Sequence, residues 1–186
     1  MKKIIVLCAL LLIALSYLFF VRYDGPYKGR VVDAETGNPI EGVVVLGVWY
    51  KEMITPAGGV GSYYDADETV TDRNGDFELK GKGLIIFKNI SSMHVLVFKA
   101  GYQYVGMGMW QSLKIDGGLM AKKVSWEGDR AVIPLRKLPD EERRSPPSPP
   151  SEAPFEDVKI MLKEIDKNDI QHGLQPRKTW KGKEIQ

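Results

Sequence analysis

The chain contains one cysteine and two histidines in its 186 residues. Because Cys8 has no second cysteine to pair with, an intramolecular disulfide is excluded, and cysteine usage does not fix the compartment. His94 and His172 are far apart in the sequence, and neither lies in an HxxE or HExxH pattern. This spacing argues against a zinc site of the peptidase type. We therefore expect no metal site and no cofactor.

A strong excess of either charge is also missing. Lysine and arginine number 26 against 24 aspartates and glutamates, so the net charge is only +2. A nucleic-acid-binding protein normally concentrates positive charge on one face, and this balance predicts no nucleic-acid partner. The Gly-x-Ser-x-Gly pattern of a nucleophile elbow is absent as well. We expect no catalytic residues and no enzyme, and a small hydrolase is the last of the alternatives.

Long apolar runs are confined to the N-terminus. After the basic start Met1-Lys2-Lys3, the segment Ile4–Val21 has only Cys8, Ser16 and Tyr17 as polar members. As a helix this segment would be roughly 27 Å long at about 1.5 Å per residue, close to the hydrocarbon thickness of a bilayer. Residues 4–21 are thus predicted to contact a membrane.

Two interpretations of residues 1–22 remain open. A signal peptide could be cleaved at the small residues of Ala14-Leu15-Ser16. Residues 17–21 stay apolar beyond that site, which favours an uncleaved signal anchor. The expected location is a bacterial inner membrane with the remainder facing the periplasm, or export if the segment is cleaved.

Short β-strands separated by turns are predicted from Gly29 to Leu138. Residues 43–50 and 94–98 are apolar on both faces, as in strands covered on two sides, whereas residues 76–79 alternate between polar and apolar. With turn signals between the strands and no long amphipathic helix, this pattern predicts an all-β fold, an antiparallel two-layer sandwich. The residues expected to meet inside it are Val43 or Val44, Phe77, Val95 or Leu96, and Ile133 or Leu135.

Two segments, 51–67 and 101–123, are longer than hairpin loops require, and loops of such length are often functional. They carry Tyr63, Tyr64 and Trp110, whose rings could stack on a sugar or anchor a protein partner. Covering the ends of the sandwich is their alternative role. These three residues are candidate contacts to a ligand or partner.

The composition changes after Leu138. Residues 139–154 are rich in proline and serine and predict a stiff polyproline spacer. A helix is predicted from Pro154 to His172, followed by a basic tail, so that residues 155–186 form the last segment. Its apolar stripe includes Phe155, Val158, Leu162 and Ile165. This stripe could dock back on the sandwich, bind a partner chain with Phe155 and Leu162 as contacts, or stay loosely ordered. Because a stiff spacer is a poor choice for a tight return, we favour the partner chain or the loosely ordered state.

Three blocks of sequence resemble the carboxypeptidase regulatory-like domain family. The first comprises Gly29–Asp33, Thr36–Ile40 and Gly42–Val45; the second is Thr71–Phe77, and the third is Lys99–Tyr102. The resemblance covers residues 27–138 and implies a transthyretin-like, seven-stranded β-sandwich. In that family the module is an accessory domain of exported or surface proteins and has no catalytic residues.

Together these features predict a non-enzymatic, membrane-anchored envelope protein. Its β-sandwich would have a structural or protein-interaction role, with another envelope protein as the possible partner. The alternative is a carbohydrate-binding module that uses the loop aromatics to hold a glycan.

Overall fold

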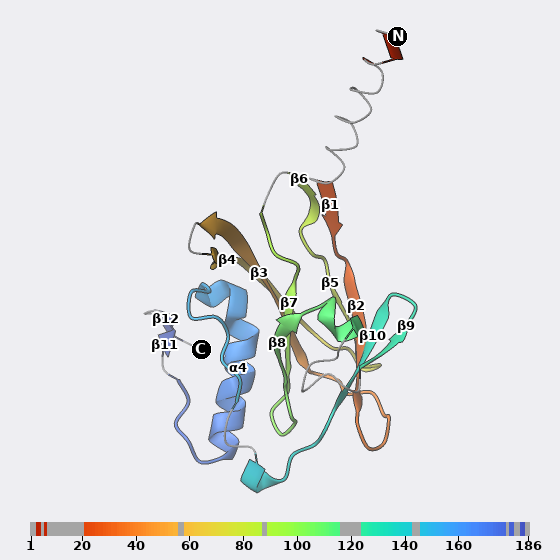
Figure 1. The fold of residues 1–186 in the computed structure, drawn as a ribbon. Helices are drawn as coiled ribbons and strands as arrows, with labels where there is room; N and C mark the ends of the chain where they lie inside the picture. The colour runs from red at the N-terminus through yellow and green to blue at the C-terminus, as the bar shows by residue number, and fades with distance from the viewer. Residues whose placement is uncertain are drawn as a thin grey trace.

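A computed structural model describes residues 3–4, 6, 21–55, 58–86, 89–115, 124–142, 146–177, 179–180 and 183–184. Its strands and one long helix together account for more than half of the described residues (Figure 1). The strands are β1 (Val21–Asp24), β2 (Tyr27–Asp33), β3 (Val44–Thr55), β4 (Gly58–Val70), β5 (Asp76–Leu79), β6 (Gly83–Ile86), β7 (His94–Phe98), β8 (Val105–Met109), β9 (Ser125–Glu127), β10 (Arg130–Leu135), β11 (Thr179–Trp180) and β12 (Lys183–Glu184). The helices are α2 (Ser112–Ile115), the short 3-10 helix η1 (Asp140–Glu142) and α4 (Phe155–Gln171).

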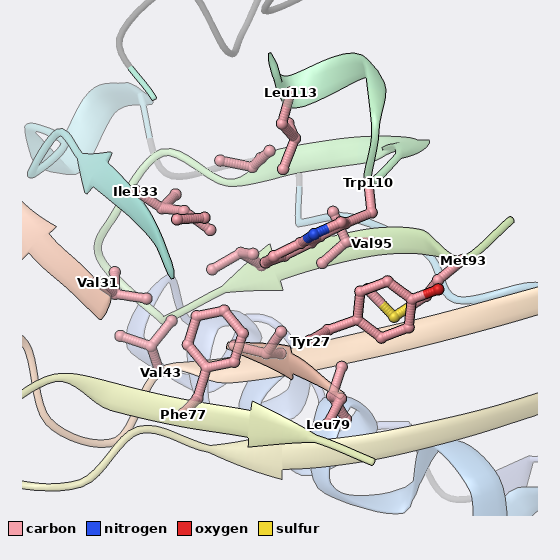
Figure 2. Packing of buried hydrophobic residues seen from close by; sticks show 14 of the residues in the cluster. Tyr27, Val31, Val43, Phe77, Leu79, Met93, Val95, Trp110, Leu113 and Ile133 are labelled. Carbon is pink, nitrogen blue, oxygen red and sulfur yellow. The ribbon is translucent and has the colours of Figure 1, made fainter. Parts of the chain in front are cut away.

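Two four-stranded sheets face each other. Their strand orders are β5-β2-β10-β9 and β4-β3-β7-β8, and two-stranded ribbons are formed by β1 with β6 and by β11 with β12. The predicted all-β fold is therefore confirmed. So is the predicted core, because side chains from both sheets pack into one buried cluster (Figure 2) that includes Val43, Phe77, Val95, Ile133 and Leu135.

The prediction of a purely antiparallel sandwich is wrong for one pair of strands. β10 pairs with β2 in parallel, with Ala131 opposite Gly29 and Ile133 opposite Val31. A hairpin would impose antiparallel pairing, but β2 and β10 are separated by the whole of the other sheet. A connection of that length allows the two strands to pair in either a parallel or an antiparallel direction. The sheet is therefore mixed.

Helix α4 forms a third layer on the outer face of the sheet β4-β3-β7-β8 (Figure 1). It begins and ends as the sequence predicted, with Pro154 and His172 at its caps. The expectation that its stripe would bind a partner chain or stay loosely ordered is wrong, because the stripe is buried within the chain itself. The cluster that it enters consists of Val44, Leu46, Val48, Ala66, Leu96, Phe98, Ala153, Val158, Met161, Leu162 and Ile165.

The proline-rich segment before α4 lies against the rest of the protein. Pro147, Pro149 and Ala153 are buried, and the Trp180 indole donates a hydrogen bond to the Ala153 carbonyl at 3.0 Å. Within the segment, the Ala153 N–H donates to the Pro150 carbonyl at 3.0 Å in the turn that leads into α4. The sequence predicted a spacer that holds the helix away from the sandwich. In the structure, the segment instead leads α4 back to the sheet.

The expected long loop at residues 51–67 is instead a β-hairpin. β3 and β4 continue pairing up to Thr55 and Gly58, beyond the point at Val48 where β3 loses its partner β7. Glycines at positions 58, 59 and 61 indicated a loop, but cross-strand pairing overrides local propensity here. The second long segment contains β8 and α2 before residues 116–123, which lie outside the described part.

At the N-terminus, β1 begins at Val21, so the predicted membrane helix of residues 4–21 cannot include its last residue. Ile4 and Val6 are described as helical, and the other residues before Val21 in this segment lie outside the described part. In the part that is described, no helix has the length and apolar character needed to cross a bilayer. β1 also precedes the expected sandwich boundary at Tyr27, so the folded body starts earlier than the sequence suggested.

Candidate functional site

Among the described residues, the most deeply buried carboxylate connects β1 to the sandwich. Asp24 is 3% exposed and accepts hydrogen bonds from the Tyr27 hydroxyl at 2.7 Å and from the Trp49 indole at 2.8 Å. Its second oxygen also accepts the Lys82 backbone N–H at 3.0 Å, and an Arg22 nitrogen lies 3.9 Å from the carboxylate. Burial raises the pKa of Tyr27, and the hydrogen bond to Asp24 raises it further. These hydrogen bonds join β1 to β3 and to the segment before β6. Both oxygens of the Asp24 carboxylate accept hydrogen bonds, so its role is structural.

A second set of polar contacts fastens α4 to the sheet. The two oxygens of Glu68 accept the backbone N–H groups of Ile160 and Met161 at 2.7 and 2.8 Å. The Tyr63 hydroxyl lies 2.7 Å from the Asp157 carboxylate, to which it donates. Further along the helix, Glu164 accepts the Ala100 N–H at 2.8 Å. The half-buried carboxylate of Glu68 is therefore a structural acceptor.

Glu68 predicts a pH dependence of stability. Burial raises the pKa of this carboxyl above its usual 4.5, and the opposing effect of its two N–H donors is smaller. As pH rises above 4.5, the unfolded chain therefore releases the Glu68 proton before the folded chain does, and the contribution of this group to stability falls. The difference in unfolding free energy, wild type minus Glu68→Gln, should decrease over that window in denaturant titrations at successive pH values. A difference that stays constant or grows with pH would contradict this.

The residues predicted as ligand contacts are separated by the fold. Tyr63 faces α4, whereas its neighbour Tyr64 is 40% exposed on β4. Phe155 is half-buried beside the helix cluster, and Leu162 is fully buried within it. Trp110 is buried in the sandwich core, with its ring edge-on to those of Tyr27 and Trp126. Tyr63 is engaged with Asp157 of α4, and Tyr64 lies at an irregularity in the pairing of β3 with β4, so the two rings do not form one stacking platform.

The sequence reasoning missed Tyr23, which is 71% exposed and is therefore more accessible than Tyr64. It lies on β1, between the predicted anchor of residues 1–22 and the predicted start of the sandwich at Tyr27. The alternation of Val21, Arg22, Tyr23 and Asp24 was the available signal. It resembles a short strand with one outward and one inward face.

The sheet β5-β2-β10-β9 has no helix over its outer face among the described residues (Figure 1). A shallow hollow of about 450 Å³ lies on this open face, and its apolar lining comes from Val32, Pro39 and Val132. Arg30, Asn74 and Glu127 supply the polar part of the lining. Protein-binding surfaces combine apolar side chains with polar ones, as this lining does. This open face is the candidate site for a protein partner.

Charges on the open face are paired across the strands. The Asp76 carboxylate of β5 lies 2.8 Å from the Arg30 guanidinium of β2 and also contacts Arg130 of β10. Lys28 lies 3.9 Å from Glu78 in the next row. Because these pairs are partly exposed, each contributes little to stability. They leave the face with charges of both signs, which suits a protein partner better than a polyanion.

The two histidines lie apart in the structure as they do in the sequence. The His94 ring stands edge-on to Tyr50 at 5.2 Å, and burial lowers the pKa of His94. His172 lies at the end of α4, with Nδ1 2.7 Å from the Asn168 carbonyl. Within the described ranges, no three histidine, cysteine, aspartate or glutamate side chains converge as ligands of one metal ion.

The chain matches no family model, no curated protein and no solved structure.

Proposed function

We propose that the protein is a non-enzymatic module of a bacterial cell envelope, tethered to the inner membrane through the part of the apolar run 4–21 that precedes β1, with its body in the periplasm. Its β-sandwich would belong to the transthyretin-like, carboxypeptidase regulatory-like type. Its role would be structural or the binding of another envelope protein. The open face of the sheet β5-β2-β10-β9 is the surface offered to that partner.

One observation carries the proposal: the apolar run leads into the folded body without a linker. Its last residue, Val21, is the first residue of β1, and Asp24 of the same strand is buried among Tyr27, Trp49 and Lys82. A membrane helix ending just before β1 would therefore hold the sandwich close to the bilayer. A cleavable leader has no need of such a connection.

The motif blocks of the family resemblance have structural tasks that support an accessory role. Asp72 Oδ1 accepts the backbone N–H groups of Asn74 and Asp76, and Gly75 has the positive φ of 74° that this turn requires. Thr71 is buried, accepts the Val43 N–H and donates to the Ile40 carbonyl. The residues that resemble the family thus build turns and strand junctions.

The tether is tested by fractionation of the full-length protein. We expect the protein to sediment with membranes and to resist extraction with alkaline carbonate, because an apolar segment of this length is stable in the hydrocarbon core. N-terminal sequencing of the mature protein should begin at Met1 or Lys2. Sequencing that begins at Tyr17 would establish cleavage after Ser16, and the tether would then be rejected.

A further inference from the structure

The ribbon of β1 and β6 has one face made only of exposed uncharged side chains. Val21 pairs with Ile86 and Tyr23 pairs with Leu84 across the two strands. Their exposed fractions are 38% for Val21, 71% for Tyr23, 60% for Leu84 and 44% for Ile86. Soluble surfaces seldom gather apolar side chains in adjacent cross-strand pairs without a binding role. We call these four residues the ribbon face.

The opposite side of the same ribbon is fixed to the protein. Ile85 is buried in the sandwich core, and Asp24 is held by its hydrogen bonds to Tyr27 and Trp49. Arg22 donates to the carbonyls of Ile90 and Ser91 at 2.6 and 2.7 Å. The ribbon therefore cannot turn its outer face inward, so that face needs a partner outside the described chain.

The apolar run that precedes the ribbon identifies the partner. Residues 4–21 end at Val21, which is itself a member of the ribbon face. At about 3.3 Å per strand residue, Tyr23 lies roughly 7 Å along the chain from Val21. If the run enters a bilayer, the ribbon face is thus held at the boundary between headgroups and acyl chains. Tyrosine and aliphatic side chains without charge are suited to that depth.

We propose that the ribbon face lies on the lipid bilayer and fixes the orientation of the sandwich relative to it. This inference rests on the proposed tether and adds a second contact to it. β1 and β6 are at the upper end of the fold in Figure 1. The β2–β3 connection, which contains the exposed residue Glu35, is at the lower end and would point away from the membrane.

The test uses the full-length chain with a single reporter cysteine. Cys8→Ala removes the only native cysteine. In that background, Leu84→Cys places an environment-sensitive nitrobenzoxadiazole label on the ribbon face, and Glu35→Cys gives the matched control at the far end. Both proteins are reconstituted into phosphatidylcholine–phosphatidylglycerol vesicles, with or without lipids that carry a nitroxide near the headgroup end of the acyl chain.

The label at position 84 should emit at shorter wavelength than the label at position 35, and only the former should be quenched by the nitroxide lipid. If both proteins resist carbonate extraction but neither label is quenched, the tether stands and the ribbon inference is wrong. A blue shift at position 84 that grows with protein density, without lipid quenching, would assign the face to a second copy and also overturn the inference. Complete extraction by carbonate would reject the tether and the ribbon contact together.

Discussion

Replacement of Ile165 by alanine should lower the free energy of unfolding by about 2–5 kcal/mol, the range for truncating a fully buried aliphatic side chain. Ile165 has no exposed surface and packs on α4 against the sheet β4-β3-β7-β8. Denaturant titration of the full-length chain in a mild detergent measures the loss. The helix offers a control of the same residue type: Ile170 is 58% exposed, and Ile170→Ala should change the unfolding free energy by no more than about 0.5 kcal/mol.

Amide hydrogen exchange provides an independent measurement of the same docking. Strong protection is expected across residues 158–165 in a protein that light scattering shows to be monomeric, because an isolated helix of this length is only marginally stable in water. Ile165→Ala should weaken that protection, and Ile170→Ala should leave it unchanged. Rapid exchange in the wild-type monomer, or equal effects of the two substitutions, would mean that α4 does not depend on the sheet.

The sequence held the information needed to predict this third layer. Residues 43–50 and 94–98 are apolar on both faces, whereas a two-layer sandwich covers only one face of each sheet. In the structure, Val43, Val45 and Trp49 enter the sandwich core, and the alternate residues of β3 pack under α4. The apolar stripe of the helix was the only predicted surface able to cover that second face. The stiffness of the proline segment was given too much weight against this requirement.

Local sequence patterns predicted which side chains are buried but not how distant strands pair. The alternation of Asp76–Leu79 correctly placed Phe77 in the core, since period-2 patterns depend only on which face of a strand is buried. The parallel pairing of β2 and β10 depends on the route of the intervening chain, which short-range signals do not encode. The open face and the ribbon face likewise form only when strands distant in sequence are brought together.

The buried role of Asp24 was also hidden in the sequence, because its partners Trp49 and Lys82 are reached only after folding. A lone aspartate beside Gly25-Pro26 looks like a turn residue. Its hydrogen bonds join β1 to β3 and to the segment before β6. They therefore fix the ribbon to the sandwich, and their loss should be among the most costly single changes in the protein.

Asp24→Ala should lower the free energy of unfolding by at least about 3 kcal/mol, because buried donors left without an acceptor cost about 1–3 kcal/mol each. The affected donors are the Tyr27 hydroxyl, the Trp49 indole and the Lys82 N–H. Tyr27→Phe, which removes one donor and keeps the acceptor, should cost less.

Asp129→Ala is the control, because Asp129 is an exposed residue before β10. This substitution should change the free energy of unfolding by no more than about 0.5 kcal/mol. Denaturant titration of the three variants gives the ranking. A loss at Asp24 no larger than that at Asp129 would show that the buried carboxylate does not stabilise the junction between the ribbon and the sandwich.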